Sequence, residues 1–378
     1  AGLPADASVR APEPAPRRSD SLSLPAAPAA SSQPEVQGHG VVPPRAADVL
    51  DEAAGHLLRQ EKMLAATKFS APAAAAVIQA VKPKRSAPLP MPPRLSPTAI
   101  SAFKDCPQLF LFRNLWKLPE PPSTVLVKGI LVHSTLEAMF EQPPAERAVR
   151  LHETLRDIWR VERVKPTNAE LFASLEEERE WGLQCLHLLD NYLAFEDPSN
   201  LPTGEPVATE AWLSAELGDA VKLVGKVDRL DAGEASEGLT IIDYKTGKAP
   251  SLKYSPATNE RIRRSNFFQL RCYALLLHRG KPPKALVGKS ASMLEARRLR
   301  LLYLGDGADG RATCLDDELP SNRAEYEAML SETEAEVVEV WRKIEALVDA
   351  GDPLAFQHCS RPFCACHDLR PLVFPESL

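Results

Sequence analysis

Apolar and polar residues alternate along three segments in the middle of the chain, and this period of two predicts β-strands. The segments are residues 206–217, 221–227 and 239–242. β-branched residues bounded by Gly and acidic turn residues favour a hairpin-like pairing of the last two segments. We expect these three strands to be antiparallel, with a further strand over residues 297–305.

A helical period of apolar residues precedes and follows these strands. The predicted helices are residues 99–114, 128–141, 143–161, 167–196, 266–277 and 323–348. Pro107 is expected to bend or split the first helix, because proline has no N–H to donate. In the second helix we expect His133 near the start, beside an apolar stripe that includes Ile130. This order of elements predicts an α/β fold, with a central mixed sheet flanked by helices and a helical insertion before the sheet.

The N-terminal part of the chain has a different composition. Residues 1–45 are rich in Pro, Ala and Ser without periodicity, which is typical of disordered segments, and residues 46–81 contain one candidate helix. We therefore expect a disordered leader over residues 1–94 and a folded domain over residues 95–378. The expected parts of this domain are a helical part over 95–204, a catalytic sheet core over 205–305, and a C-terminal helix with a Cys-containing tail over 306–378.

Composition excludes some classes of protein. The chain of 378 residues is 44% hydrophobic, which allows a sizeable core, but no apolar run approaches 18 residues, so we expect no membrane span. An odd count of seven cysteines argues against a secreted disulfide framework, so we expect an intracellular protein. The compartment stays open, with an organelle or the nucleus as alternatives in a eukaryote. The net charge of −6 means that any contact with nucleic acid requires a local basic groove.

Charged side chains end the two strands of the predicted hairpin. Asp228 ends the first strand, and Asp243 and Lys245 end the second. Residues two apart in a strand share a face, so Asp243 and Lys245 point the same way and can converge with Asp228 at one end of the sheet. Two carboxylates in a small volume repel each other unless a cation joins them, and oxygen ligands suit hard divalent cations. The pattern therefore predicts a Mg²⁺ or Mn²⁺ site that can activate water.

Five segments resemble, in the same order, the motifs of the PD-(D/E)XK nuclease superfamily and, within it, of the RecB-like exonucleases. The segments are LSPTAISAFKDCPQLFLFR, KGILVHSTLE, VGKVDRLD, TIIDYKTGKAP and FFQLRCYALLL, and they cover about residues 95–305. Each segment is a weak signal alone, but five in family order form a strong one. The resemblance implies a restriction-endonuclease-like core and metal-dependent hydrolysis of phosphodiester bonds.

The resemblance also implies a role for each matching residue of the candidate metal site. His133 corresponds to the histidine of the family's GxxxH helix, which is a metal ligand. Asp228 and Asp243 correspond to the two acidic metal ligands. Lys245 corresponds to the motif lysine, which orients the attacking water or helps to deprotonate it, and which offsets charge on the phosphate.

Three further residues have counterparts in the family. Gln269 and Tyr273, at i and i+4 of a predicted helix, resemble the QxxxY pair, which supports the site and contacts the nucleic-acid strand. Glu210 falls where relatives often have an acidic residue one strand earlier, and we expect it at most as an outer ligand.

Many relatives hold a [4Fe–4S] cluster through one early cysteine and three late ones. Cys106 lies where the early ligand is expected. The late cysteines of this chain are Cys359, Cys364 and Cys366. Their spacing departs from the usual C-x2-C-x5-C, and alignment to that pattern places Cys364 on the first ligand, His367 on the second and Val373 on the third. Cys359 and Cys366 are nearby substitutes, so an Fe–S cluster, a Zn²⁺ site and a metal-free tail all stay open.

The leading hypothesis is a DNA nuclease, an exonuclease on single strands or DNA ends, that acts in repair or recombination, with a helicase or repair protein as a candidate partner. The basic residues between Lys253 and Arg264 could follow the phosphates, or they could form a solvated loop; the sequence favours neither. The alternatives are an inactive nuclease fold that binds nucleic acid or a repair partner, and an RNA-processing or small-molecule hydrolase with the same metal chemistry. The oligomeric state stays open.

Overall fold

The computed structural model describes Ile78 and residues 87–119, 123–218, 221–233, 238–288, 291–307 and 309–375. All of them belong to one compact unit that runs from Asp51 to Leu378. The expected disordered leader and its candidate helix lie almost wholly outside the described residues, so they stay predictions. None of the described helices is long and apolar enough to cross a membrane.

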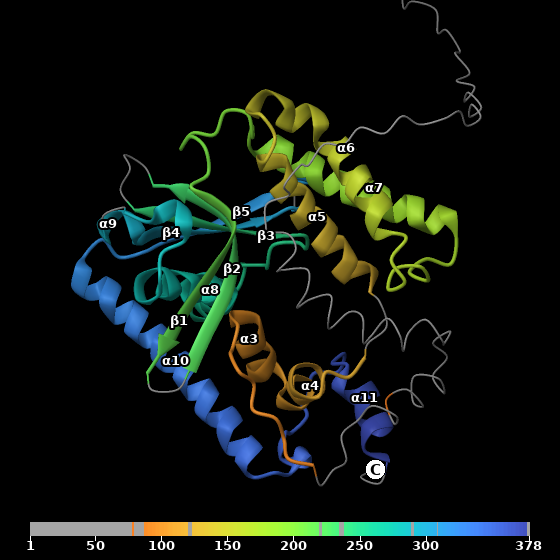
Figure 1. Cartoon of the computed structure of the whole chain (residues 1–378), viewed down its shortest axis with the longest axis vertical. Helices are drawn as coiled ribbons and strands as arrows, with labels where there is room; N and C mark the ends of the chain where they lie inside the picture. Colours follow the sequence, from red (N-terminus) through yellow and green to blue (C-terminus); the bar gives the residue numbers. More distant parts are fainter. Residues whose placement is uncertain are drawn as a thin grey trace, which may run out of the picture. The chain divides into compact units, whose positions relative to one another are not determined.

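A mixed sheet of five strands forms the centre of the described part of the chain (Figure 1). The strands are β1 (Ala208–Leu217), β2 (Val221–Ala232), β3 (Leu239–Lys245), β4 (Ala296–Tyr303) and β5 (Thr313–Glu318). They lie side by side in chain order, and neighbours are antiparallel except for β3 and β4, which are parallel. A parallel pair needs a long crossover connection, and the segment with helix α8 (Pro256–Arg279) supplies it.

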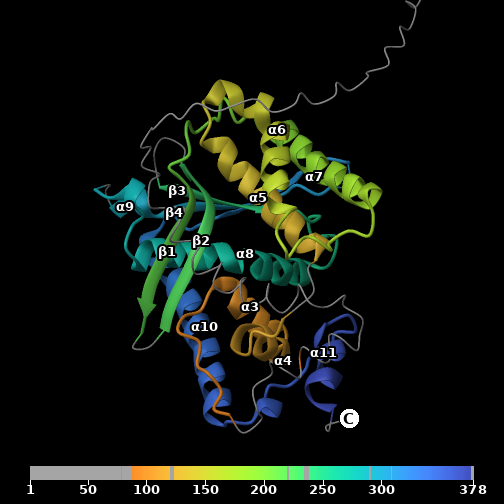
Figure 2. The same ribbon diagram turned by 45° about the vertical axis from the view of Figure 1, so that its right-hand side comes forward.

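Helices cover both faces of the sheet (Figures 1 and 2). One face packs against α5 (Thr124–Phe140), α6 (Pro144–Glu162) and α7 (Leu175–Phe195), and the other against α3 (Pro97–Asp105), α8 and α10 (Arg323–Asp349). β3 is buried from both sides, because Ile241 packs in one apolar cluster and Ile242 and Tyr244 in the other. The central strand that carries Asp243 and Lys245 is therefore held rigidly between two layers.

The α/β architecture with a helical part before the sheet is confirmed, and the first helix is split at Pro107 as expected. Its pieces are α3, α4 (Pro107–Phe110) and a π-helix (Leu111–Leu115). The second helix differs from the prediction, because Ser123 caps it and α5 begins at Thr124. His133 consequently lies in the middle of α5, and Ile130 is 53% exposed and does not belong to an apolar core stripe.

Two other helices begin at different residues from those predicted. α8 begins at Pro256, because Pro suits the first turn and Ser255 Oγ accepts a hydrogen bond from Thr258 N at 3.3 Å. The segment predicted as a basic loop is therefore helical from this residue onward. α7 begins at Leu175, where Ser174 caps the first turn.

The sheet also extends beyond the expected boundary at residue 305. β5 was not predicted, because its sequence, TCLDDE, is acidic and has weak strand propensity. It pairs with β4 through cross-strand ion pairs, in which Arg300 Nη2 lies 2.7 Å from Asp316 Oδ2 and Arg298 Nε lies 2.5 Å from Glu318 Oε1. Opposite charges facing each other thus stabilise an edge strand that apolar alternation cannot reveal.

Candidate active site

Three residues from three elements bring potential metal ligands together on the α5 side of the sheet. His133 of α5, Glu210 of β1 and Asp228 of β2 each offer one ligand atom, and these atoms lie within 4.8 Å of one another. His133 Nδ1 lies 3.4 Å from Asp228 Oδ2, and the same oxygen accepts a hydrogen bond from Tyr244 N at 2.8 Å. Imidazole and carboxylate donors at this separation suit a divalent cation.

Asp243 and Lys245 form the adjacent half of the site. Asp243 is 2% exposed, and its Oδ2 lies 2.6 Å from Lys245 Nζ. Lys245 Nζ also donates to Gln269 Oε1 at 3.0 Å, and Gln269 Nε2 donates to Tyr273 OH at 2.7 Å. These three contacts hold the ammonium group of Lys245 beside Asp243 and fix its orientation.

The expected position of the acids at strand ends is wrong in one respect. β2 continues to Ala232, so Asp228 lies within the strand and not at its end. Asp228 lies between Val227, which pairs with Ala211, and Arg229, which pairs with Thr209, and no ladder pair joins it to Glu210. Glu210 and Asp228 therefore lie within their strands, at the position where the ladder between β1 and β2 lacks a pair.

The interruption coincides with an unusual backbone at Glu210. Its φ is 47°, in the left-handed region that side chains other than Gly rarely adopt. Such conformations persist mainly where the surrounding structure requires them, often in functional sites. Glu210, expected at most as an outer ligand, offers its carboxylate within 4.8 Å of the ligand atoms of His133 and Asp228.

The electrostatics of the metal-free site show an excess of negative charge. Burial lowers the pKa of His133, but the carboxylates of Asp228, Asp243 and Glu210 outweigh it and raise this pKa to about 8. Burial, and then the charge of Asp228, raise the pKa of Asp243 to about 6 against the effect of Lys245. The site thus takes up a proton where no cation is bound, and a divalent ion would relieve the same repulsion.

Two residues near the site were not singled out in the sequence. Glu137 lies one turn after His133 on α5, and burial raises the pKa of its carboxyl group. Lys226 Nζ lies 2.5 Å from Glu210 Oε2 and so neutralises part of the charge. The spacing of i and i+4 from His133 was a usable signal for Glu137, whereas the contact of Lys226 depends on strand pairing.

Gly225 allows the close approach that supports the site from behind. A Cβ atom at this position would lie 2.5 Å from Tyr273 Cε1 and 3.3 Å from Leu276 Cδ1. Only a residue without a side chain lets α8 pack this closely on β2, and this packing places Tyr273 and Gln269 next to Lys245.

We expect Glu210→Gln to weaken Mn²⁺ binding by at least about 10-fold, because an amide is a poorer ligand for a hard cation than a carboxylate. Isothermal titration calorimetry of the metal-free protein measures this affinity. Glu216→Gln, on an exposed part of the same strand, is the matched control. Equal affinity for the two variants and the wild type would remove Glu210 from the ligand set.

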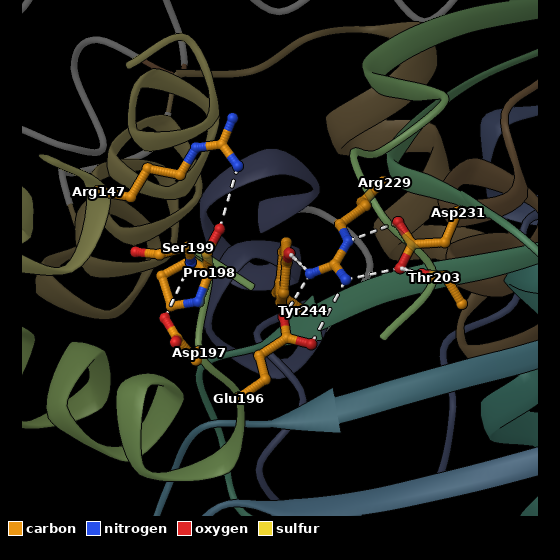
Figure 3. Close-up of polar contacts among 9 residues, drawn as sticks. All are labelled: Arg147, Glu196, Asp197, Pro198, Ser199, Thr203, Arg229, Asp231 and Tyr244. Atoms are coloured by element: carbon orange, nitrogen blue, oxygen red, sulfur yellow. Dashed lines mark hydrogen bonds and ion pairs between the residues drawn. The ribbon is translucent and has the colours of Figure 1, made fainter. Parts of the chain in front are cut away.

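A buried arginine joins the two strands of the site to the helical part (Figure 3). Arg229, next to Asp228, donates to Asp231 through Nε at 2.7 Å and through Nη2 at 2.6 Å. It also pairs with Glu196, which caps the C-terminal end of α7, and its Nη1 donates to Tyr244 OH at 3.2 Å. One guanidinium thus links β2, β3 and α7 directly behind Asp228 and Asp243.

The same arginine holds the helix that carries His133. Phe140, the last residue of α5, lies between Arg229 and Arg147, whose guanidinium carbons are 5.1 Å and 5.2 Å from its ring centroid. Arg147 also donates to Phe140 O at 3.3 Å, to Pro198 O at 3.0 Å and to both carboxylate oxygens of Glu205. The clamp fixes the C-terminal end of α5 against β2 and so sets the position of His133 relative to Asp228.

We expect Arg229→Met to lower the melting temperature by about 10 °C, because it leaves the buried carboxylate of Asp231 and the partly buried carboxylate of Glu196 without their partner. Differential scanning calorimetry measures the change. Arg264→Met, which removes an exposed ion pair with Glu332, is the control and should cost no more than about 2 °C. Similar losses for the two variants would contradict the role of the buried network.

The four cysteines Cys106, Cys359, Cys364 and Cys366 converge in a second site. One sulfur atom from each lies within 4.8 Å of the others, and Cys359 Sγ and Cys366 Sγ are 3.9 Å apart. All four are free thiols. This set joins the turn between α3 and α4 to the C-terminal tail.

The alignment that placed His367 and Val373 on ligand positions is wrong. His367 Nε2 lies 2.9 Å from Arg361 O, and Val373 is buried in the apolar core. Cys359 and Cys366 occupy the positions instead, because the tail folds back before its short helix α11 (Cys366–Val373). Sequence spacing alone could not reveal this path.

The protonation of these thiols differs. Burial raises the pKa of Cys106 and of Cys366. Burial also opposes ionisation of Cys359, but hydrogen bonds from Arg361 outweigh it and lower the pKa of this thiol to about 6. Four thiol groups without carboxylates suit soft or borderline metals, so the donor set fits an Fe–S cluster or Zn²⁺.

The fold and the acidic site together define a nuclease-like α/β protein with a restriction-endonuclease-like core. The chain belongs to the PD-(D/E)XK nuclease superfamily, whose family model matches residues 94–369. A comparison with curated proteins finds no significant match. Among solved structures, the one described as "Crystal structure of SSO0001" is similar at 16% identity, with a TM-score of 0.25 and coverage of 59% of this chain and 86% of that chain.

Proposed function

We propose that this protein is a divalent-metal-dependent DNA nuclease that hydrolyses phosphodiester bonds with Mg²⁺ or Mn²⁺. The observation that carries the proposal is the convergence of His133, Glu210 and Asp228 within 4.8 Å, beside the buried pair Asp243 and Lys245. Membership of the superfamily supports it, because these nucleases typically use such ions. We further propose exonuclease action on single strands or DNA ends, as in the RecB-like branch, in DNA repair or recombination with a helicase or repair protein as partner.

The proposed roles of the residues follow from their positions. His133, Glu210, Asp228 and Asp243 would hold the ion, which supplies charge compensation for the phosphate and activates water. Lys245 is one-third exposed and is oriented by Asp243 and Gln269, so its ammonium group can donate to a phosphate oxygen as negative charge grows there. Tyr273 fixes Gln269 and therefore acts through Lys245.

The basic segment before and within α8 offers less to the phosphates than its sequence implies. Arg264 Nη2 lies 2.6 Å from Glu332 Oε1, and Arg263 Nη1 donates to Asp316 O at 3.1 Å. Two of the four basic side chains between Lys253 and Arg264 are thus engaged within the protein. We propose that any phosphate contact from this segment comes from Lys253 and Arg261, which are exposed.

We also propose that Cys106, Cys359, Cys364 and Cys366 bind a metal centre, either a [4Fe–4S] cluster or Zn²⁺. The centre would fasten the C-terminal tail to the turn between α3 and α4, and it would have a structural role. Visible absorption near 400 nm and metal analysis of anaerobically purified protein distinguish the cluster from Zn²⁺.

Digestion of end-labelled oligonucleotides tests the proposed function. The full chain is incubated with single-stranded DNA, duplex DNA and single-stranded RNA, in Mg²⁺ or Mn²⁺ and in EDTA. We expect cleavage of DNA that EDTA abolishes, and the order in which labelled products appear separates exonuclease from endonuclease action. Binding without cleavage under all conditions would favour an inactive nucleic-acid-binding module instead.

A further inference from the structure

A groove runs from the candidate metal ligands along α5. Its volume is about 550 Å³, and it lies between α5 and strands β1 and β2. At one end it is lined by His133, Glu210 and Lys226, and at the other by the apolar residues Val125, Leu126 and Ile130. The groove is thus continuous with the place where a phosphate would be bound.

The apolar residues share a helix face with the metal ligand. Leu126, Ile130, His133 and Glu137 follow one another at spacings of four, three and four residues, which places them on one side of α5. Leu126 lies about 10 Å from His133 along the helix axis, at the rise of about 1.5 Å per residue. Gly129 adds no side chain to the groove and leaves it open beside Ile130.

These side chains are exposed although the opposite face of α5 is well packed. Leu131, Val132 and Leu136 are at most 1% exposed, whereas Val125 is 72% and Leu126 is 63% exposed. A helix that already buries one apolar face has no need of a second for its own packing. An apolar surface beside a charged site is typical of a binding surface.

An exposed aromatic side chain lies on the same face of the sheet as one residue of the groove. Trp212 of β1 is 53% exposed, and it is the cross-strand partner of Lys226, which lines the groove. Residues directly opposite each other in an antiparallel pair lie on the same face of the sheet. The indole ring and the apolar residues of α5 therefore belong to the surface on which the metal site opens.

We infer that this groove binds the nucleotides of a single strand that adjoin the scissile phosphate, with their bases against Leu126, Ile130 and Trp212. The inference rests on the proposed nuclease function and adds the surface on which the strand would lie. A phosphate at the metal site places the next nucleotide of the strand in the groove. A single strand offers its apolar base faces there, and stacking or apolar contact with bases is independent of sequence.

A duplex suits this surface poorly. It presents closely spaced phosphates, one per about 1.7 Å of helix axis, and keeps its base faces stacked inside. Contact with the apolar residues would remove water from the phosphates without giving them a hydrogen bond. The chemistry of the groove therefore favours unpaired strands or ends over duplex DNA.

Fluorescence anisotropy with Ca²⁺, which replaces Mg²⁺ to slow hydrolysis, tests the inference on the full chain. The probes are a fluorescein-labelled oligo(dT), an abasic strand of the same length and a duplex of the same length. We expect wild-type protein to bind oligo(dT) about 10-fold more tightly than the abasic strand, because only oligo(dT) has bases for the groove. The double variant Leu126→Ser/Ile130→Ser should bind both strands alike, and Trp212→Ala should reduce the preference.

The matched control is the double variant Val149→Ser/Val161→Ser, which changes two exposed apolar residues of α6 away from the groove and should behave as wild type. The inference is overturned if the Leu126→Ser/Ile130→Ser protein keeps the wild-type preference for oligo(dT). It is also overturned if this protein loses the same factor of affinity for oligo(dT) and for the abasic strand.

This experiment separates the inference from the proposed function, because it reads binding and not cleavage. If the protein cleaves DNA but binds oligo(dT) and the abasic strand alike, the groove does not bind bases, and the proposed nuclease function stands. If the protein prefers oligo(dT) through the groove residues but never cleaves DNA, the proposed nuclease activity is wrong, and the role of the groove in binding bases stands.

Discussion

Asp243→Asn is expected to reduce DNA cleavage by at least about 1,000-fold, since the variant loses the carboxylate proposed as a metal ligand and the partner that orients Lys245. The fold should survive, because the amide has the shape of the carboxyl group and fits the same buried space. Digestion of labelled single-stranded DNA in Mg²⁺ and in Mn²⁺ measures the loss. Cleavage at the wild-type rate would refute the assignment of this residue.

The same variant should be more stable than the wild type when no metal is bound. Burial and the charge of Asp228 raise the pKa of Asp243 to about 6 from its ordinary value of 3.8. The folded protein therefore holds this proton more tightly than the unfolded chain, and wild-type stability falls as pH rises from about 4 through about 6. Asn does not titrate, so in EDTA at pH 8 its melting temperature should be about 5 °C higher.

A matched measurement at low pH checks the cause. Near pH 4 the wild-type carboxyl group is protonated in the folded state, and the difference in melting temperature between the two proteins should largely disappear. If Asp243→Asn raised the melting temperature equally at both pH values, or lowered it at pH 8, the electrostatic account of the site would be contradicted.

Cys106→Ser is expected to release the metal of the cysteine site and to lower the melting temperature of the metal-loaded protein by about 15 °C. The reason is that the site joins the turn after α3 to the tail, far apart in the sequence, and an incomplete ligand set holds metal weakly. Metal analysis, visible absorption and calorimetry measure the two effects.

Cys314→Ser is the matched control, because this thiol on β5 is partly exposed and lies outside the cysteine site. It should keep both the metal and the melting temperature. If the wild-type protein is colourless and free of Fe and Zn, and if Cys106→Ser melts normally, the four cysteines form no metal centre.

The strands that show apolar and polar alternation in their own sequence could be predicted. Alternation identified β1 to β3, and the shared face of Asp243 and Lys245 followed from the strand period of two, whereas Asp228 was expected at the end of β2 and lies within it. β5 was missed because its acidic sequence is paired with Arg298 and Arg300 of another strand, and this pairing leaves no apolar alternation to recognise.

The parts of the site that depend on distant contacts were not predictable. Glu210 lies near His133 at a position where its backbone has a φ of 47° and the ladder lacks a pair, which no local propensity indicates. The convergence of the four cysteines depends on the path of the tail, so spacing led to an alignment with His367 instead. Arg229 is next to Asp228 in the sequence, but its role behind the site required the positions of α5 and α7.

The central claim is that one divalent ion is held between the helix-borne His133 and the acids of the sheet. Anomalous diffraction from crystals of the protein soaked in MnCl₂ tests it most directly. The account predicts a Mn²⁺ peak at about 2.0–2.4 Å from ligand atoms of His133, Glu210, Asp228 and Asp243. Strong Mn²⁺ peaks elsewhere, with His133 still paired with Asp228 and no density between them, would contradict it.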